Sequence, residues 1–306
     1  MYDIILNDGN KIPCIGLGSG SKTMQWPEYR PFKRTILGRV ANHYLNIYHD
    51  RHMCKMVIKS FEHSFNCGYR FIDWSAAYGR GELIKAAIKN VGLERSQLYL
   101  TSRVSNVEQY SGNIREAFFR TIRELGVDYL DLYLFHWPVT DHYIKTYKEM
   151  EKLRKDGYVK SIGVCNCKEH HLQRILDECD IVPAIDQIEV HPLFTQKELI
   201  EFCNNHNICV MAYTPLARND DRLQKNSILK RLCEKYNKNL GQIILRWDIQ
   251  QGIIPIPRSN NPQRQASNID IFDFELNSDE MQEIDSININ SRLRFDADNI
   301  DFHSIG

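Results

Sequence analysis

The chain has 306 residues, of which 42% are hydrophobic, and its 39 basic residues balance its 39 acidic ones. A formal net charge of zero provides no overall field that would attract nucleic acid, an anionic polymer or a membrane surface. No apolar run approaches the ~20 residues that a membrane helix needs, and no basic start leads into a signal-like stretch. The nine cysteines form an odd set without a paired Cys-x-x-Cys spacing, so we expect reduced thiols in a cytoplasmic protein.

Strand patterns alternate with amphipathic helical patterns along the whole chain. An opening hairpin turns at Asp8-Gly9 and is expected to plug the bottom of a barrel. Helices are predicted at 114–125, which ends at Gly126, and at 146–155, 196–205 and 227–237. The eight strands predicted after the hairpin are 14–19, 69–73, 98–103, 129–136, 160–165, 184–189, 208–213 and 252–257.

Apolar strands that are each followed by a helix predict an α/β fold, a (β/α)8 TIM barrel of about 250 residues with an N-terminal β-hairpin cap. One domain spanning residues 1–306 is preferred to two. Residues 21–52 form an apparent insertion after the first barrel strand, before a helix predicted at 53–65. Because the insertion leaves the carboxyl end of a strand, it is expected either to cover the barrel mouth or to pack as an extra helix on the flank.

Polar side chains follow the predicted strands at the end where such barrels carry their catalytic groups. Asp73 closes one apolar run, Tyr78 follows five positions later, and His136 ends another run. Taken singly, these are more simply a helix cap, a packing aromatic and a hydrogen-bonded histidine. Together, a phenol, an imidazole and a carboxylate at neighbouring strand ends are typical of a site that protonates oxygen.

The segments 68–73 with Tyr78, 134–138, 162–166, 187–192, 212–216 and 256–259 resemble, in order, the signatures of the aldo-keto reductases. The tail 294–302 resembles the endings of short-looped bacterial-type members such as the diketogluconate reductases. The resemblance covers nearly the whole chain. It implies an NADPH-dependent oxidoreductase that reduces an aldehyde or ketone to an alcohol by hydride transfer.

The resemblance also implies roles for the strand-end groups. Tyr78 matches the general acid, Asp73 the carboxylate that orients a cation beside it, and His136 the imidazole that orients the carbonyl. Arg103 stands where the family has lysine. A guanidinium is larger and more diffuse than an ammonium, and it is expected to bind Asp73 in a bidentate fork that leaves less of its field on Tyr78.

Further positions match the family's cofactor contacts. For the nicotinamide end these are the stacking ring Tyr213 and the carboxamide partners Asn166 and Gln187, with Cys165 replacing a serine. Two guanidiniums without a neighbouring acid suit a 2′-phosphate, which favours NADPH over NADH. The matching positions for the 2′-phosphate, the adenine and the adjoining loop are Arg258, Ser259, Arg264, Asn268 and Leu216.

The substrate pocket is less well defined. Trp74 and Trp137 are expected to line its mouth, and Gly20 replaces an aromatic residue that is usual in the family. The pairs His170/His171 and His49/His52 have no matching cysteine or carboxylate ligands nearby, so no metal is expected. The expected partner is a small carbonyl compound, and the protein is expected to be a monomer or weak oligomer that binds no nucleic acid and no membrane.

A second function remains open at this point. Arg103 and Cys165 depart from the family pattern, which would also fit a cofactor-binding but catalytically weak sensor or structural homologue. Retention of the acid, the carboxylate and the imidazole favours the enzyme.

Overall fold

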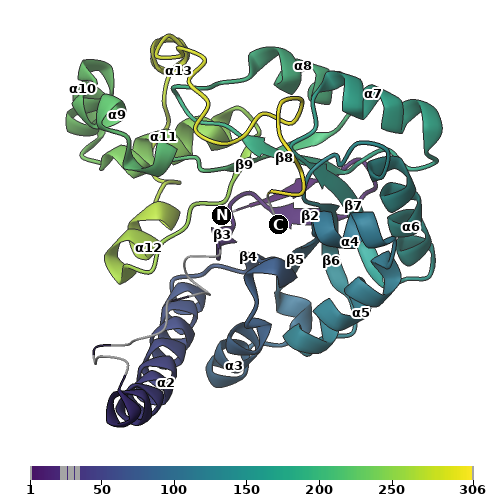
Figure 1. Ribbon diagram of the computed structural model, residues 1–306. Helices are drawn as coiled ribbons and strands as arrows, with labels where there is room; N and C mark the ends of the chain where they lie inside the picture. The colour runs from purple at the N-terminus through teal and green to yellow at the C-terminus, as the bar shows by residue number, and fades with distance from the viewer. Residues whose placement is uncertain (1, 21–25, 27–30, 32–34, 305–306) are drawn as a thin grey trace.

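The computed structural model describes residues 2–20, 26, 31 and 35–304 (Figure 1). Parallel strands form one eight-stranded sheet in the order β10-β9-β8-β7-β6-β5-β4-β3. The backbone N–H groups of Gly16 and Gly18 donate to the carbonyls of Pro255 and Pro257, at 3.0 and 3.1 Å, and join the first barrel strand to the last. All eight predicted strands are confirmed, as β3 (Leu17–Gly18), β4 (Phe71–Asp73), β5 (Tyr99–Val104), β6 (Leu130–Phe135), β7 (Val159–Cys165), β8 (Ile185–Glu189), β9 (Cys209–Tyr213) and β10 (Ile254–Pro255).

The opening hairpin closes the bottom of the barrel, as predicted. Strands β1 (Asp3–Ile5) and β2 (Lys11–Pro13) pair antiparallel. Ile12 is fully buried and packs with the side chains that fill the barrel interior. Asn7 donates to the carbonyl of Pro183 at 2.9 Å and Asn10 to that of Lys160 at 3.1 Å. Both acceptors lie where strands begin, so the opposite rim is left for the site.

Helices surround the sheet, and α5 shows why they form where the periodicity predicts. Its buried residues include Ile114, Phe118 and Leu125 on one face, and Gly126 ends the helix with a φ of 68°. Burying each of these large side chains stabilises the fold by about 1.5–3 kcal/mol. The other helices are α3 (Gly81–Val91), α4 (Asn106–Ser111), α6 (Tyr143–Lys155), α7 (Glu169–Glu178), α8 (Lys197–Asn205), α9 (Asp221–Lys225), α10 (Ser227–Tyr236), α11 (Leu240–Gln250), α12 (Pro262–Ile269) and α13 (Ser278–Asp285), with short 3-10 turns η1 (Ala76–Tyr78), η2 (Arg95–Gln97) and η3 (Ala217–Asn219).

The helix α2 (Ile36–Asn66) corrects the predicted start at residue 53. Thr35 caps it by accepting from the N–H of Gly38, and no proline interrupts the 31 residues that follow, so the helix propagates once begun. Its second half buries Phe61 and Phe65 against the barrel. The helix contacts α3 and α12 on the flank of the barrel, and its first half extends away from the barrel (Figure 1). Residues 36–52 therefore fit the flank interpretation, and 21–25, 27–30 and 32–34 lie outside the described residues.

Two further observations concern the chain as a whole. Within the described residues, no helix combines the length and apolar character needed to cross a membrane. All nine cysteines are free thiols.

Candidate active site

The parallel sheet brings the expected polar groups to one rim of the barrel. Asp73 is the last residue of β4, Arg103 lies near the end of β5, and His136 directly follows β6. Tyr78 ends the turn η1, which begins after β4 and is capped by Ser75. The hydrogen bond from the Tyr78 N–H to the Ser75 carbonyl, at 2.8 Å, holds this turn.

Arg103 is the centre of a buried polar network, with a side chain only 3% exposed. Its Nη2 donates to Oδ1 of Asp73, and its Nη1 donates to Oε1 of Gln187 at 2.7 Å. Gln187 Nε2 in turn donates to Oδ1 of Asp73 at 3.1 Å. The expected bidentate fork between Arg103 and Asp73 is therefore wrong, because the second guanidinium nitrogen is taken by Gln187. Removing one partner of a buried ion pair typically costs about 3–5 kcal/mol, because the other charge is left buried and unpaired.

The environment of Tyr78 keeps its proton on the phenol. Burial raises the pKa of Tyr78, the charge of Arg103 lowers it, and the charge of Asp73 raises it again. The result is a pKa above the ordinary value of 10.0. A protonated phenol at neutral pH is suited to giving a proton to an oxygen.

His136 is held as a neutral imidazole. Burial lowers its pKa to about 3, with further contributions from the positive charges of Arg103 and Arg294. Its backbone carbonyl accepts a hydrogen bond from Nδ2 of Asn166 at 2.9 Å. Within the described part of the chain its Nδ1 is buried without a partner. A neutral imidazole offers one N–H donor, which can point at a carbonyl oxygen.

Two of the expected nicotinamide contacts lie together. The hydroxyl of Tyr213, at the end of β9, donates to Oδ1 of Asn166 at 2.7 Å. Asn166 has a left-handed backbone with a φ of 59°, which turns its side chain at the end of β7. Gln187 differs, because both ends of its amide are engaged with Arg103 and Asp73. Cys165 is fully buried beside this group.

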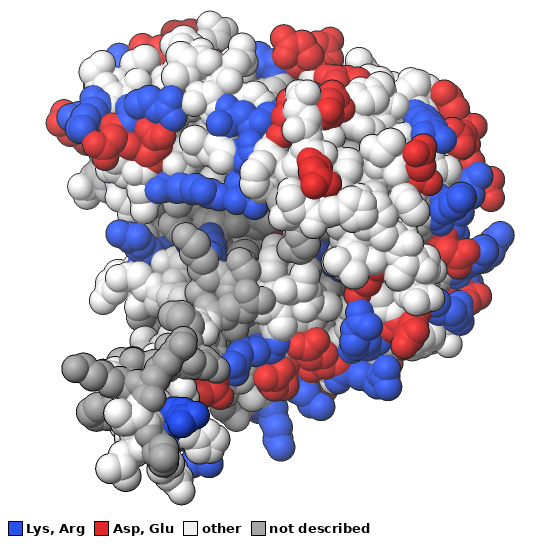
Figure 2. Space-filling view, viewed as in Figure 1, with Lys and Arg blue, Asp and Glu red and all other residues white. Residues whose placement is uncertain are grey.

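The expected phosphate contacts lie on an exposed basic rim. Arg258 and Arg264 are exposed, and among the described residues neither guanidinium pairs with a carboxylate. Arg264 lies in the first turn of α12, where the N-cap Asn261 accepts from its backbone N–H at 3.0 Å. A helix N-terminus adds partial positive charge for an anion. Figure 2 shows Lys and Arg side chains along a central hollow on the α12 side of this face.

The remaining cofactor positions are less open. A Cβ on Gly20 would lie 2.9 Å from Cδ of Arg258, so glycine gives the arginine room. Ser259 accepts from the N–H of Asn261 at 3.1 Å. Asn268 is 4% exposed, and Leu216 is half-buried against the core.

The two tryptophans assigned to the pocket differ in position. Trp74 is 1% exposed, packs against Gly81 and donates from Nε1 to the Gly79 carbonyl at 3.1 Å. Its large apolar ring is therefore part of the core, and the expectation that it lines the mouth is corrected. Trp137 is 4% exposed and lies next to His136, with ring centroids 6.3 Å apart, and the ring of the tail residue Phe302 lies 6.4 Å from its own.

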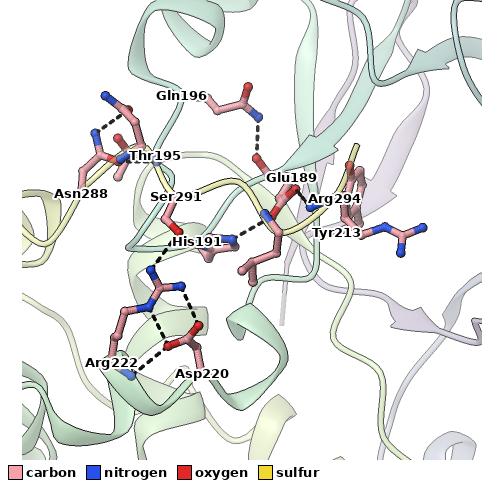
Figure 3. Close-up of polar contacts among 12 residues, drawn as sticks. Glu189, His191, Thr195, Gln196, Tyr213, Asp220, Arg222, Asn288, Ser291 and Arg294 are labelled. Atoms are coloured by element: carbon pink, nitrogen blue, oxygen red, sulfur yellow. Dashed lines mark hydrogen bonds and ion pairs between the residues drawn. The ribbon is translucent and has the colours of Figure 1, made fainter. Parts of the chain in front are cut away.

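The sequence analysis missed Glu189, a fully buried carboxylate at the end of β8. It accepts from Nε2 of His191 and from the backbone N–H groups of Leu293 and Arg294, at 3.0, 2.7 and 2.9 Å (Figure 3). Burial alone would raise the pKa of Glu189, but these hydrogen bonds outweigh burial and lower it. The signal available in the sequence was an acid inside an apolar strand, because such an acid needs partners.

The structure also brings His170 and His171 together with Asp298 of the tail, with possible ligand atoms within 4.8 Å of one another. The expectation of no carboxylate near this histidine pair was therefore wrong. Lys168 already binds Asp298 at 2.7 Å, and Nδ1 of His171 accepts from the backbone N–H of Lys168, which leaves its proton on Nε2. The cluster fits an ion-pair network that fastens the tail to α7 better than a metal site.

Comparison with known proteins gives a consistent family assignment. A family model described as "Aldo/keto reductase family" matches residues 50–289. The methylglyoxal reductase DkgA of Escherichia coli strain K12 is 40% identical over 297 residues, which is 96% of each chain. The glyoxal reductase of Bacillus subtilis strain 168 is 42% identical over 235 residues, 77% of this chain and 84% of that protein.

Solved structures agree with the sequence comparisons. The Bombyx mori aldo-keto reductase in complex with NADP superposes with a TM-score of 0.81 at 32% identity, covering 97% of this chain and 96% of that one. An aldo-keto reductase from a Medee basin deep-sea metagenome library gives a TM-score of 0.83 at 31% identity, covering 97% and 99%. The chain therefore belongs to the aldo/keto reductase family and is an oxidoreductase that reduces carbonyl groups with a nicotinamide cofactor.

Proposed function

We propose that this protein reduces small aldehydes and dicarbonyl compounds to alcohols with NADPH, at the rim formed by Asp73, Tyr78, Arg103 and His136. The observation that carries the proposal is the buried network of Arg103, Asp73 and Gln187 close to a protonated Tyr78 and a neutral His136. Two relatives are named methylglyoxal reductase and glyoxal reductase, which supports a small dicarbonyl as substrate.

The roles of the side chains follow from their protonation states. The N–H of His136 donates to the substrate carbonyl and orients it, since the imidazole is neutral at working pH. NADPH, when bound, supplies the hydride. Tyr78 gives its proton to the carbonyl oxygen as negative charge develops there. Arg103 lowers the pKa of Tyr78 against the effect of burial, and Asp73 fixes the guanidinium.

The residues present fit NADPH at both ends of the molecule. Tyr213 and Asn166 are hydrogen-bonded to each other and are our proposed contacts for the nicotinamide. Our proposed contacts for the adenosine are Ser259, Asn268 and Leu216. Arg258 and Arg264 have no acidic partner among the described residues, so both guanidiniums are available to a phosphate dianion. Gln187 is the weakest assignment to the cofactor, because its amide is held by Arg103. The nine free thiols fit the cytoplasmic location that we propose.

The test is NADPH oxidation with methylglyoxal, glyoxal and a panel of simple aldehydes, in the wild type and in Tyr78→Phe. The variant keeps the ring, so it should fold and bind NADPH with normal quenching of its tryptophan fluorescence, while reduction falls by about 100-fold or more. Tyr147→Phe is the matched control, since Tyr147 is fully buried in α6 and its hydroxyl has no partner among the described residues. Binding without turnover in the wild type would favour the catalytically weak homologue, and an active Tyr78→Phe would mean that another group is the acid.

A further inference from the structure

The C-terminal tail holds residue 294 over the active-site rim. On one side, the backbone N–H groups of Leu293 and Arg294 donate to the two oxygens of Glu189, at the end of β8. On the other side, the ring of Phe295 lies 6.5 Å from that of Trp137, which directly follows His136. The tail thus spans from β8 to β6 across the carboxyl ends of the strands, as Figure 1 shows for the last segment of the chain.

The guanidinium of Arg294 has no carboxylate partner among the described residues, and it lies over the ring of the adjacent Phe295, 5.4 Å from the ring centroid. The side chain is exposed, and within residues 35–304 it forms no ion pair. Figure 3 shows it extending on the side of Tyr213, away from His191 and Asp220. The neighbouring Arg292 also lies over a ring, that of Phe194 at 4.5 Å, but it differs because it pairs with Asp296 at 3.8 Å.

The charge of Arg294 reaches the reacting end of the site. The pKa of His136 is lowered first by burial, then by the charge of Arg103 and then by that of Arg294. Burial raises the pKa values of Tyr78 and Tyr213, and the charge of Arg294 acts in the opposite direction on both. Glu189, the carboxylate that binds the backbone of Arg294, already accepts from His191 and two backbone N–H groups. An uncompensated cation at the mouth attracts an anion, and the phosphate-binding arginines belong to the other end of the site.

We propose that Arg294 determines substrate specificity by binding a carboxylate of the substrate while the carbonyl lies between Tyr78 and His136. This inference rests on the proposed function and narrows it to oxo acids, in which one short chain carries both a carbonyl and an anionic group. The backbone of Arg294 is held by Glu189 at the end of β8, and a guanidinium can pair with a carboxylate in a bidentate orientation. The neutral dicarbonyls remain substrates, with a higher KM than the oxo acids.

The experiment compares succinic semialdehyde with its methyl ester, which removes the charge and keeps the aldehyde. For the wild type, kcat/KM should favour the acid by about tenfold, mainly through KM, and the preference should shrink in about 0.5 M salt. In Arg294→Met the ratio of acid to ester should fall to near one, and Arg294→Lys should recover part of it. Arg292→Met is the matched control and should keep the wild-type ratio.

The outcomes separate the two proposals. Equal kcat/KM for acid and ester in the wild type, or an unchanged ratio in Arg294→Met, overturns the role of Arg294 while reduction of the ester upholds the proposed function. Failure to reduce the acid, the ester and methylglyoxal with NADPH refutes the proposed function and this inference with it.

Discussion

Replacing Arg103 by lysine restores the residue that the family has at this position and tests how the arginine has changed the site. The guanidinium is shared between Asp73 and Gln187 in the structure. An ammonium cannot make both bonds in the same geometry, so Gln187 loses its donor. We expect Arg103→Lys to be less stable than the wild type, yet to lower the pKa of Tyr78, because the charge becomes compact and is no longer held by Gln187.

The magnitude follows from the lost bond. A hydrogen bond to a charged group contributes about 1.5–3 kcal/mol, and Gln187 is only 1% exposed, so water does not replace it. Since the pair with Asp73 is kept, the free energy of unfolding should fall by about 2 kcal/mol, which corresponds to roughly 3 °C in Tm for a chain of 306 residues. Arg103→Met should cost more, about 3–5 kcal/mol, because Asp73 is then an unpaired buried charge.

The assay is a pair of pH profiles, for carbonyl reduction and for alcohol oxidation, with thermal unfolding measured alongside. Oxidation needs the phenolate of Tyr78, so a lower pKa moves its profile to lower pH, by about one unit, and raises its rate more than that of reduction. Arg95→Lys is the matched control, because Arg95 pairs with Asp131 at 2.6 Å at the opposite end of the barrel. It should lower stability without moving either profile.

One result would refute this reasoning. If Arg103→Lys lowers both activities equally and leaves the oxidation profile in place, the charge of residue 103 does not set the pKa of Tyr78. The arginine would then be an adapted part of the site, and its contact with Gln187 would be the feature that catalysis needs.

Two further predictions concern the cofactor and the acid stability of the fold. Arg264→Ala should weaken NADPH binding at least tenfold and leave NADH binding nearly unchanged, since the charge-assisted bond to a 2′-phosphate contributes about 1.5–3 kcal/mol. Fluorescence titration with both cofactors measures the two affinities. Equal losses of affinity for NADPH and NADH would contradict the assignment. The pKa of His136 is about 3 in the folded protein against an ordinary 6.5, so the unfolded state takes up its proton first and stability falls by about 1.4 kcal/mol per pH unit below 6.5. Urea titrations at about pH 7 and pH 5 measure how much the free energy of unfolding falls between the two pH values. The fall should be smaller by about 2 kcal/mol in His136→Gln than in the wild type, and identical falls would show that His136 is not buried as a neutral imidazole.

Local patterns were enough to predict the barrel and the rim. Each strand is a short apolar run whose end is marked by a polar residue, and in parallel strands those ends meet at one edge. The positions of Asp73 and His136 at one rim followed from that rule, and the assignment of Tyr78 beside them also needed the family resemblance. The hairpin plug followed from the same reasoning, because its turn residues and its place before the first barrel strand are local features.

Only the tertiary structure could decide which residues far apart in the sequence form hydrogen bonds with one another. Arg103 and Gln187 are 84 positions apart, and Glu189 is 104 positions from Leu293, so no periodicity links them. Trp74 directly follows Asp73, the last residue of β4, yet its ring turns into the core, since the direction of a side chain after a strand depends on what packs there. The amino-acid sequence by itself determined the fold, through local period and order, and it supplied the candidate reacting groups, whose roles the family resemblance implies. The tertiary structure decided which donor each buried acceptor receives and which cation is left unpaired at the mouth, because hydrogen bonds between distant segments exist only once the barrel has closed.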